Sequence, residues 1–140
     1  MRIFILSIIL ALSFKANAII SPDYFDISKF LGSWSWTTST KCTETYTFKE
    51  KGILQLKSGE ELTDNKYQIK KPEQAGRLAK LTFTTIKDYG GKDCAGSTSD
   101  STGQSAEMYI GISPDSTKML NCDTSEGQDC WLLKKVDDAN

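Results

Sequence analysis

The sequence predicts an all-β protein, an eight-stranded antiparallel up-and-down barrel entered by a short N-terminal helical turn. The main observation is that apolar and polar residues alternate with a period of two in about eight short runs between Gly32 and Val136. Turn-forming residues separate these runs, and closure into a barrel would remove the exposed edges of so many short strands. The 140 residues, 39% of them hydrophobic and 25% charged, have the composition of one globular domain.

The helical turn and the first strands are expected in the N-terminal half. Asp26 is suited to cap a turn that ends at Leu31. Apolar pairs spaced by two residues then mark three strands: Trp34 with Trp36, Tyr46 with Phe48, and Leu54 with Leu56. Residues 50–52 form a tight hairpin signal, and residues 58–61 form the next turn.

The remaining strands are expected from similar runs further along the chain. They are Lys66 to Lys70, Arg77 to Lys87, Ala106 to Ile112, Thr117 to Cys122 and Cys130 to Val136. Between the second and third of these runs lies the longest irregular segment, residues 88–104, rich in glycine, serine and threonine. We expect this segment to be a long loop.

The first 18 residues have the features of a secretory signal peptide. Arg2 precedes the apolar run of residues 3–12, and Ala16-Asn17-Ala18 resembles a cleavage site. A buried N-terminal helix is the alternative, but this run is far more apolar than anything after it. We therefore expect residues 1–18 to be removed and residues 19–140 to form a single barrel domain in the periplasm or outside the cell.

Four cysteines remain after the expected cleavage. An even number in an exported chain favours two disulfides. Metal binding is a poor alternative because there is no Cys-x-x-Cys pair and no histidine. Cys122 and Cys130 flank a short polar loop that can close a hairpin, so we expect them to pair, leaving Cys42 to pair with Cys94.

Composition and spacing argue against several classes of function. The chain has no histidine, which removes imidazole-based catalysis and metal sites, and Glu60 and Glu61 would point to opposite faces of a strand. A net charge of −1 gives no basic surface for nucleic acid. We therefore expect no enzymatic activity, no metal, no cofactor, no nucleic-acid binding and no membrane insertion, and we expect a monomer.

One segment resembles a known family. Residues 25–34, with Gly32 and Trp34 in a Gly-x-Trp motif after the predicted turn, resemble the opening of the lipocalins and the wider calycin group. Residues 46–52 are similar to the first hairpins of small lipocalin-like proteins exported by bacteria. The resemblance implies structural roles for Gly32 and Trp34, with Trp34 at the closed base of the barrel under Lys134 or Lys135.

The predicted barrel supports two hypotheses about function. In the first, the barrel binds a small apolar ligand in a cavity lined by Trp36, Tyr46, Phe48, Phe83 and Met108. These side chains could instead simply fill the barrel. In the second, the barrel is a scaffold and the loop of residues 88–104 binds another exported protein, as in a hydrolase inhibitor or an envelope adaptor.

Overall fold

The computed structural model describes residues 25–137, and the predicted signal peptide lies outside them. Its elements are η2 (Ile27–Phe30), β1 (Gly32–Thr37), β2 (Thr43–Lys49), η3 (Glu50–Gly52), β3 (Ile53–Ser58), β4 (Glu61–Lys70), β5 (Ala79–Asp88), β6 (Ser105–Ile112), β7 (Lys118–Cys122) and β8 (Cys130–Val136). Both η elements are single 3-10 turns. In this part of the chain no helix is long and apolar enough to cross a membrane.

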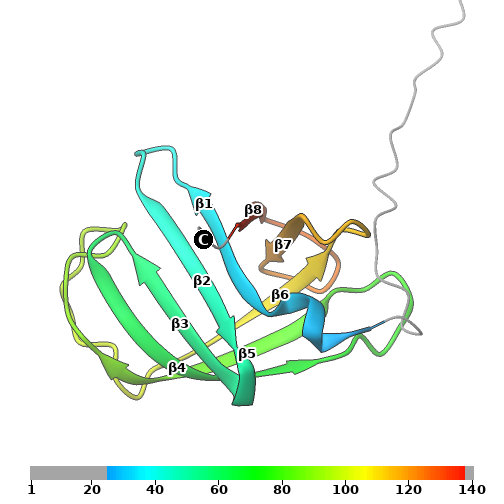
Figure 1. The fold of residues 1–140 in the computed structure, drawn as a ribbon, viewed down its shortest axis with the longest axis horizontal. Coiled ribbons are helices and arrows are strands. Elements are labelled where there is room, and N and C mark those ends of the chain that lie inside the picture. Colours follow the sequence, from blue (N-terminus) through cyan, green and yellow to red (C-terminus); the bar gives the residue numbers. More distant parts are fainter. Residues whose placement is uncertain (1–24, 138–140) are drawn as a thin grey trace, which may run out of the picture.

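The eight strands form a closed antiparallel barrel in chain order, which confirms the predicted fold class (Figure 1). The sheet closes where β1 pairs with β8, with Trp34 opposite Lys135. We call one end of the barrel the mouth; it carries the loops of residues 38–42, 59–60 and 89–104. The loop of residues 123–129 contacts the β4–β5 loop instead: the Ser125 carbonyl accepts from the Leu78 N–H, and Glu126 pairs with Arg77. The other end, the base, carries η2, η3 and the two remaining loops.

The base is filled by a ring of inward side chains, one from each strand. In a barrel the strands are staggered, so residues at one level follow diagonal steps across the register. The ring consists of Trp34, Phe48, Leu54, Tyr67, Leu81, Ile110, Met119 and Leu133, all of which are buried. Burying these apolar side chains away from water stabilises the fold.

Trp34 connects this ring to the N-terminal turn. Its indole Nε1 donates a hydrogen bond of 2.8 Å to the carbonyl of Phe30, which is itself buried at the end of η2. Asp26 caps that turn as predicted, accepting from the backbone N–H of Ser28. On the other side of the indole, the Lys135 Nζ lies 5.1 Å from the ring centroid. Of the two lysines considered, Lys135 is therefore the one that covers Trp34.

The predicted strand boundaries need one substantial correction. β4 begins at Glu61 rather than Lys66, and residues 61–66 pair with β3 along its whole length. The prediction was wrong because Thr63 and Asn65 are polar, although both side chains are buried on the inner face. The hairpin at residues 50–52 is as predicted, with Lys51 and Gly52 at positive φ, a conformation that glycine adopts without strain.

Both predicted disulfides are present, and the longer one lies at the mouth. Cys42–Cys94 joins the β1–β2 loop to the long β5–β6 loop, with a sequence separation of 52 residues. Cys122–Cys130 joins the ends of β7 and β8, with a separation of 8 residues. These two covalent bonds fit the oxidising compartment expected for an exported chain.

Removing the longer bridge should cost more stability than removing the shorter one. The loop-entropy model gives about 4 kcal/mol for the Cys42–Cys94 bridge and about 2.5 kcal/mol for Cys122–Cys130. We expect C42A/C94A to unfold at a lower urea concentration than C122A/C130A, with both below the unsubstituted protein. Equal midpoints would show that the long loop contributes no constraint on the unfolded chain.

Candidate functional site

A second ring of inward side chains lies above the base ring, toward the mouth. It consists of Trp36, Tyr46, Leu56, Asn65, Phe83, Met108, Asn121 and Trp131. Four of the five residues predicted to line a cavity belong to it: Trp36, Tyr46, Phe83 and Met108. The fifth, Phe48, lies in the base ring, where its ring packs edge-on against Tyr67 at a centroid distance of 5.2 Å.

A pocket of about 190 Å³ opens inside the mouth beside this second ring. Its lining comes from β3, β4, β5, β6 and the end of the long loop: Leu56, Glu61, Thr63, Asn65, Phe83, Thr85, Ser101, Gln104, Ser105 and Ala106. Of the five predicted ligand residues, only Phe83 lines it. The pocket is therefore mixed in character, with an apolar wall of Leu56, Phe83 and Ala106 and a larger number of polar groups.

A chain of hydrogen bonds fixes one side of the mouth. The Glu44 carboxylate accepts from Trp36 Nε1 at 3.0 Å and from Ser58 Oγ at 3.0 Å. Ser58 Oγ in turn accepts from the backbone N–H of Cys94 at 3.1 Å. Burial and the nearby Glu44 carboxylate both raise the pKa of Tyr46, so its hydroxyl stays protonated. The hydrogen bond from Nε1 to Glu44 therefore fixes the indole of Trp36 in addition to its packing.

Asn65 and Asn121 are both fully buried in the second ring, but only one of them is satisfied. Asn65 donates to the Leu54 carbonyl and to Thr63 Oγ1, and it accepts from Thr85 Oγ1 at 2.9 Å. The side-chain amide of Asn121 has no hydrogen-bond partner on either atom among residues 25–137. Leaving a buried donor or acceptor unpaired costs about 1–3 kcal/mol.

Glu61 is a carboxyl group at the mouth whose pKa is raised. Desolvation, followed by the negative charges of Asp88, Asp93 and Glu44, raises its pKa. The pKa of Asp88 is lowered instead, chiefly because it accepts hydrogen bonds from the backbone N–H groups of Ser101 and Gly90. Asp88 therefore keeps its negative charge, and Glu61 is the group of this pair that takes up a proton.

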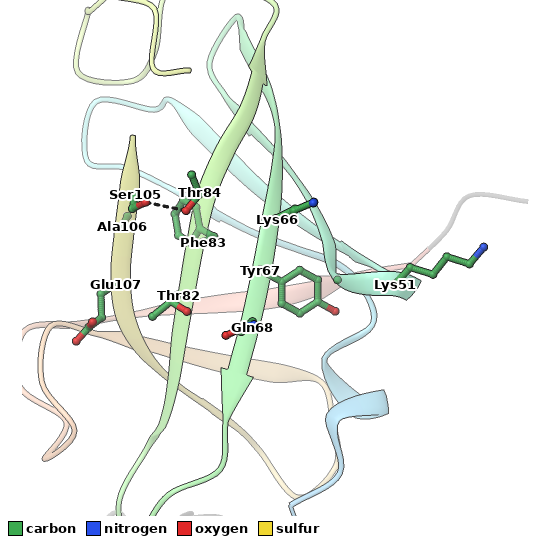
Figure 2. A pocket seen from close by; sticks show the side chains of 11 residues that line it. Lys51, Lys66, Tyr67, Gln68, Thr82, Phe83, Thr84, Ser105, Ala106 and Glu107 are labelled. Atoms are coloured by element: carbon green, nitrogen blue, oxygen red, sulfur yellow. Dashed lines mark hydrogen bonds between the residues drawn. The ribbon is translucent and has the colours of Figure 1, made fainter. Parts of the chain in front are cut away.

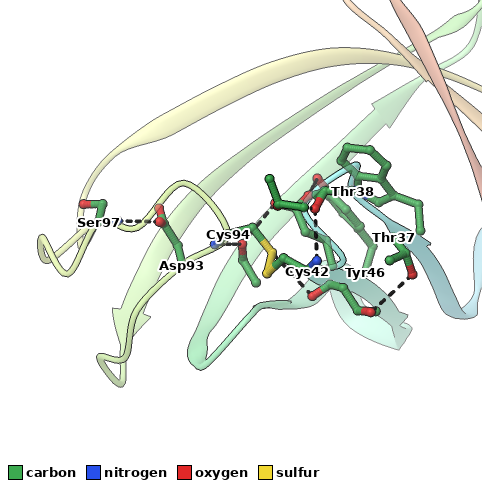
Figure 3. The surroundings of a disulfide bond; sticks show 12 residues. Thr37, Thr38, Cys42, Tyr46, Asp93, Cys94 and Ser97 are labelled. Atoms are coloured by element: carbon green, nitrogen blue, oxygen red, sulfur yellow. Dashed lines mark hydrogen bonds between the residues drawn. A yellow bond between two sulfur atoms is a disulfide. The ribbon is translucent and has the colours of Figure 1, made fainter.

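The long loop is fastened to the rim of the mouth at several points (Figure 3). Besides the disulfide at Cys94, the Lys92 carbonyl accepts from the Glu60 N–H at 2.9 Å. Gly91 lies so close to Glu60 that a Cβ atom would collide with the Glu60 backbone, and its φ is +111°. Within the loop, Asp93 and Ser97 exchange two hydrogen bonds. The loop is an ordered part of the rim.

A larger hollow of about 580 Å³ lies on the outside of the barrel (Figure 2). It crosses β4, β5 and β6, and its outward side chains include Lys66, Gln68, Thr82 and Glu107. Thr84 and Ser105 join its strands by a side-chain hydrogen bond of 2.7 Å. This hollow lies on the outer side of the sheet, whereas the smaller pocket opens into the barrel interior, where small barrels bind their ligands. The mouth is therefore the stronger candidate site.

The polar residues of the mouth were not predicted from the sequence. Thr63, Asn65, Thr85 and Asn121 all continue the inward alternation of strands whose apolar members had been recognised. Extending the period of two by one or two further positions would have placed polar side chains inside the barrel. The regular spacing of these polar residues was present in the sequence, but a search for alternating apolar residues alone does not detect it.

Comparison with known proteins adds no identity to these observations. No family model, no curated protein and no solved structure matches the chain. Among residues 25–137, no group of three or more acidic or cysteine side chains is arranged to hold a metal ion.

The raised pKa of Glu61 predicts a pH dependence of stability. A carboxyl that is protonated more readily in the folded state stabilises the fold at low pH, and this contribution is lost as the pH rises above the ordinary carboxyl range. We expect E61Q to show a flatter dependence of the urea midpoint between pH 4 and pH 7 than the unsubstituted protein. E60Q, at the neighbouring exposed position, is the control. An unchanged slope in E61Q would contradict the assignment.

Proposed function

We propose that this chain is a small, exported, non-enzymatic protein that binds a small ligand in the mouth of its barrel. The observation that carries the proposal is the pocket beside Phe83, which opens into the barrel interior and has both apolar and polar walls. Such a combination is typical of ligand sites in small barrels. The lipocalin-like opening of the sequence supports the same assignment, as does the position of Trp34 under Lys135.

The size of the pocket limits the ligand. A volume of 190 Å³ equals the liquid volume of about six water molecules. A ligand of about ten non-hydrogen atoms would occupy it, and ligands of that size bind with dissociation constants in about the millimolar to micromolar range. The apolar part of the ligand would lie against Leu56 and Phe83, and a polar part would face the amide of Asn65 and the hydroxyl groups of Thr63 and Thr85.

Filling the pocket should abolish binding without unfolding the protein. Ala106 lines the pocket and its side chain is exposed, so A106F should occupy the space at little cost in stability. We expect benzamide or toluene to shift backbone resonances of residues around Phe83 in ¹H–¹⁵N NMR titrations, and A106F to weaken this binding at least tenfold. A95F, on the exposed long loop, is the matched control. If neither benzamide nor toluene binds the unsubstituted protein, the proposal is wrong.

The ordered long loop supports a second candidate function, recognition of another exported protein. Its attachment through Cys94, Lys92 and Asp88 would reduce the entropy lost when a partner binds. This alternative predicts that the protein inhibits a member of a panel of exported proteases and glycosidases. Deletion of residues 97–102 should abolish the inhibition, whereas A106F should leave it unchanged. Inhibition that survives the deletion would exclude the loop as the binding element.

A further inference from the structure

The mouth pocket is lined by one carboxyl group, that of Glu61, and by no lysine or arginine among the described residues. Glu61 is half-buried at the first position of β4. Neither of the two ion pairs formed among residues 25–137 includes a residue of the pocket lining. The wall of the pocket therefore carries a negative charge that no basic side chain of the lining neutralises.

Three further carboxyl groups surround Glu61. They belong to Asp88 on β5, Asp93 on the long loop and Glu44 on β2, and after desolvation their charges are what raises the pKa of Glu61. Hydrogen bonds from serine hydroxyl groups hold both Asp88 and Glu44 in place. Like charges fixed around one opening produce a negative potential there, and such a potential attracts cations and repels anions.

The polar groups at the floor and rim of the pocket have used most of their donors within the protein. Asn65 gives its two amide protons to a β3 carbonyl and to Thr63 Oγ1, and Thr85 gives its hydroxyl proton to Asn65 Oδ1. Ser101 gives its hydroxyl proton to Asp88. A hydroxyl oxygen that has donated its proton still has lone pairs with which to accept. The pocket therefore suits a ligand group that brings donors of its own.

We infer that Glu61 selects ligands in which a protonated primary amine is attached to a small apolar body. The inference rests on the proposed function, because it assigns the polar end of that ligand. An ammonium group has three donors and no acceptor, so it can pair with the Glu61 carboxylate and donate to hydroxyl oxygens of the lining. A cation beside Glu61 also favours the ionised form of this carboxyl group. The apolar body would lie against the wall formed by Leu56, Phe83 and Ala106.

Other kinds of ligand complement the pocket less well. The carboxyl groups of the mouth repel an anion, and a neutral ligand would leave their mutual repulsion unchanged. A metal ion is the other cation to consider. Within the part of the chain that the structure describes, however, no three acidic or cysteine side chains are arranged to hold one. A metal ion would also leave the apolar wall without a partner, so the pocket favours an organic cation.

Benzylamine and benzyl alcohol test the inference on the unsubstituted protein, because they have the same size and differ in charge. In ¹H–¹⁵N NMR titrations at about pH 7 we expect benzylamine to bind at least tenfold more tightly than benzyl alcohol. Salt screens charges near the surface, so this advantage should shrink at about 1 M sodium chloride. If benzyl alcohol binds as tightly as benzylamine, the selection of amines by Glu61 is wrong while the proposed function stands.

Two variants then locate the amine. E61Q keeps the size of the side chain and removes its charge, so it should weaken benzylamine binding by about tenfold or more. E60Q removes a charge at the neighbouring exposed position and should keep the affinity. A106F, which fills the pocket, should weaken the binding of both probes.

Three outcomes would overturn the inference. Benzylamine binding that is unchanged in E61Q or in A106F would place the amine outside the pocket. Binding of calcium chloride at the mouth without binding of benzylamine would show that the carboxyl groups serve a metal ion. If none of benzylamine, benzyl alcohol and toluene binds the unsubstituted protein, the inference and the proposed function both fail. The comparison of the two matched probes needs no variant, so it decides the matter even if E61Q does not fold.

Discussion

Trp34 lies at the seam where the first and last strands close the sheet, and the rest of the structure depends on how that seam is held. Its backbone pairs with both β2 and β8, its indole donates to the turn that precedes β1, and its ring is part of the base layer. The direct pairing between β1 and β8 spans only three residue pairs. Packing around Trp34, together with Lys135 over its ring, supplements those few backbone hydrogen bonds.

The two levels of the barrel interior differ in how they are stabilised. The base ring is apolar and buried, so it contributes through the hydrophobic effect and close packing. The ring above it mixes aromatic side chains with amides, and the mouth beyond it is fixed by Glu44, Ser58 and the Cys42–Cys94 bridge. The complete apolar core therefore occupies the base level, and the pocket opens at the level above it.

Much of the fold followed from local patterns in the sequence. Alternation of the type seen at Trp34 and Trp36 predicts both the strand and the side of the sheet that each side chain faces. The short polar loop between Cys122 and Cys130 was enough to pair these two cysteines and to leave Cys42 for Cys94. The site was less accessible to this reasoning. Phe48 and Phe83 occupy equivalent positions in the pattern, yet one lies in the base ring and the other lines the pocket. The stagger between neighbouring strands decides at which level of the barrel each side chain lies, and the sequence of a single strand does not reveal that stagger.

The sequence could not predict that the Asn121 amide is unpaired, for a related reason. Asn65 and Asn121 are the same residue type at inward positions of short strands, and nothing local distinguishes them. Whether each is satisfied depends on partners from other strands, such as Thr85 on β5 for Asn65. Tertiary pairing, rather than residue type, therefore decides whether a buried amide is satisfied.

The longer covalent bridge, Cys42–Cys94, lies at the mouth, while the base ring relies on packing. The region that would meet a ligand is therefore anchored independently of the region that holds the fold together. Under such a division, side chains of the mouth can change over evolutionary time without disturbing the hydrophobic layer. The same scaffold could then acquire new specificities through substitutions near the rim, with the architecture of the base retained throughout.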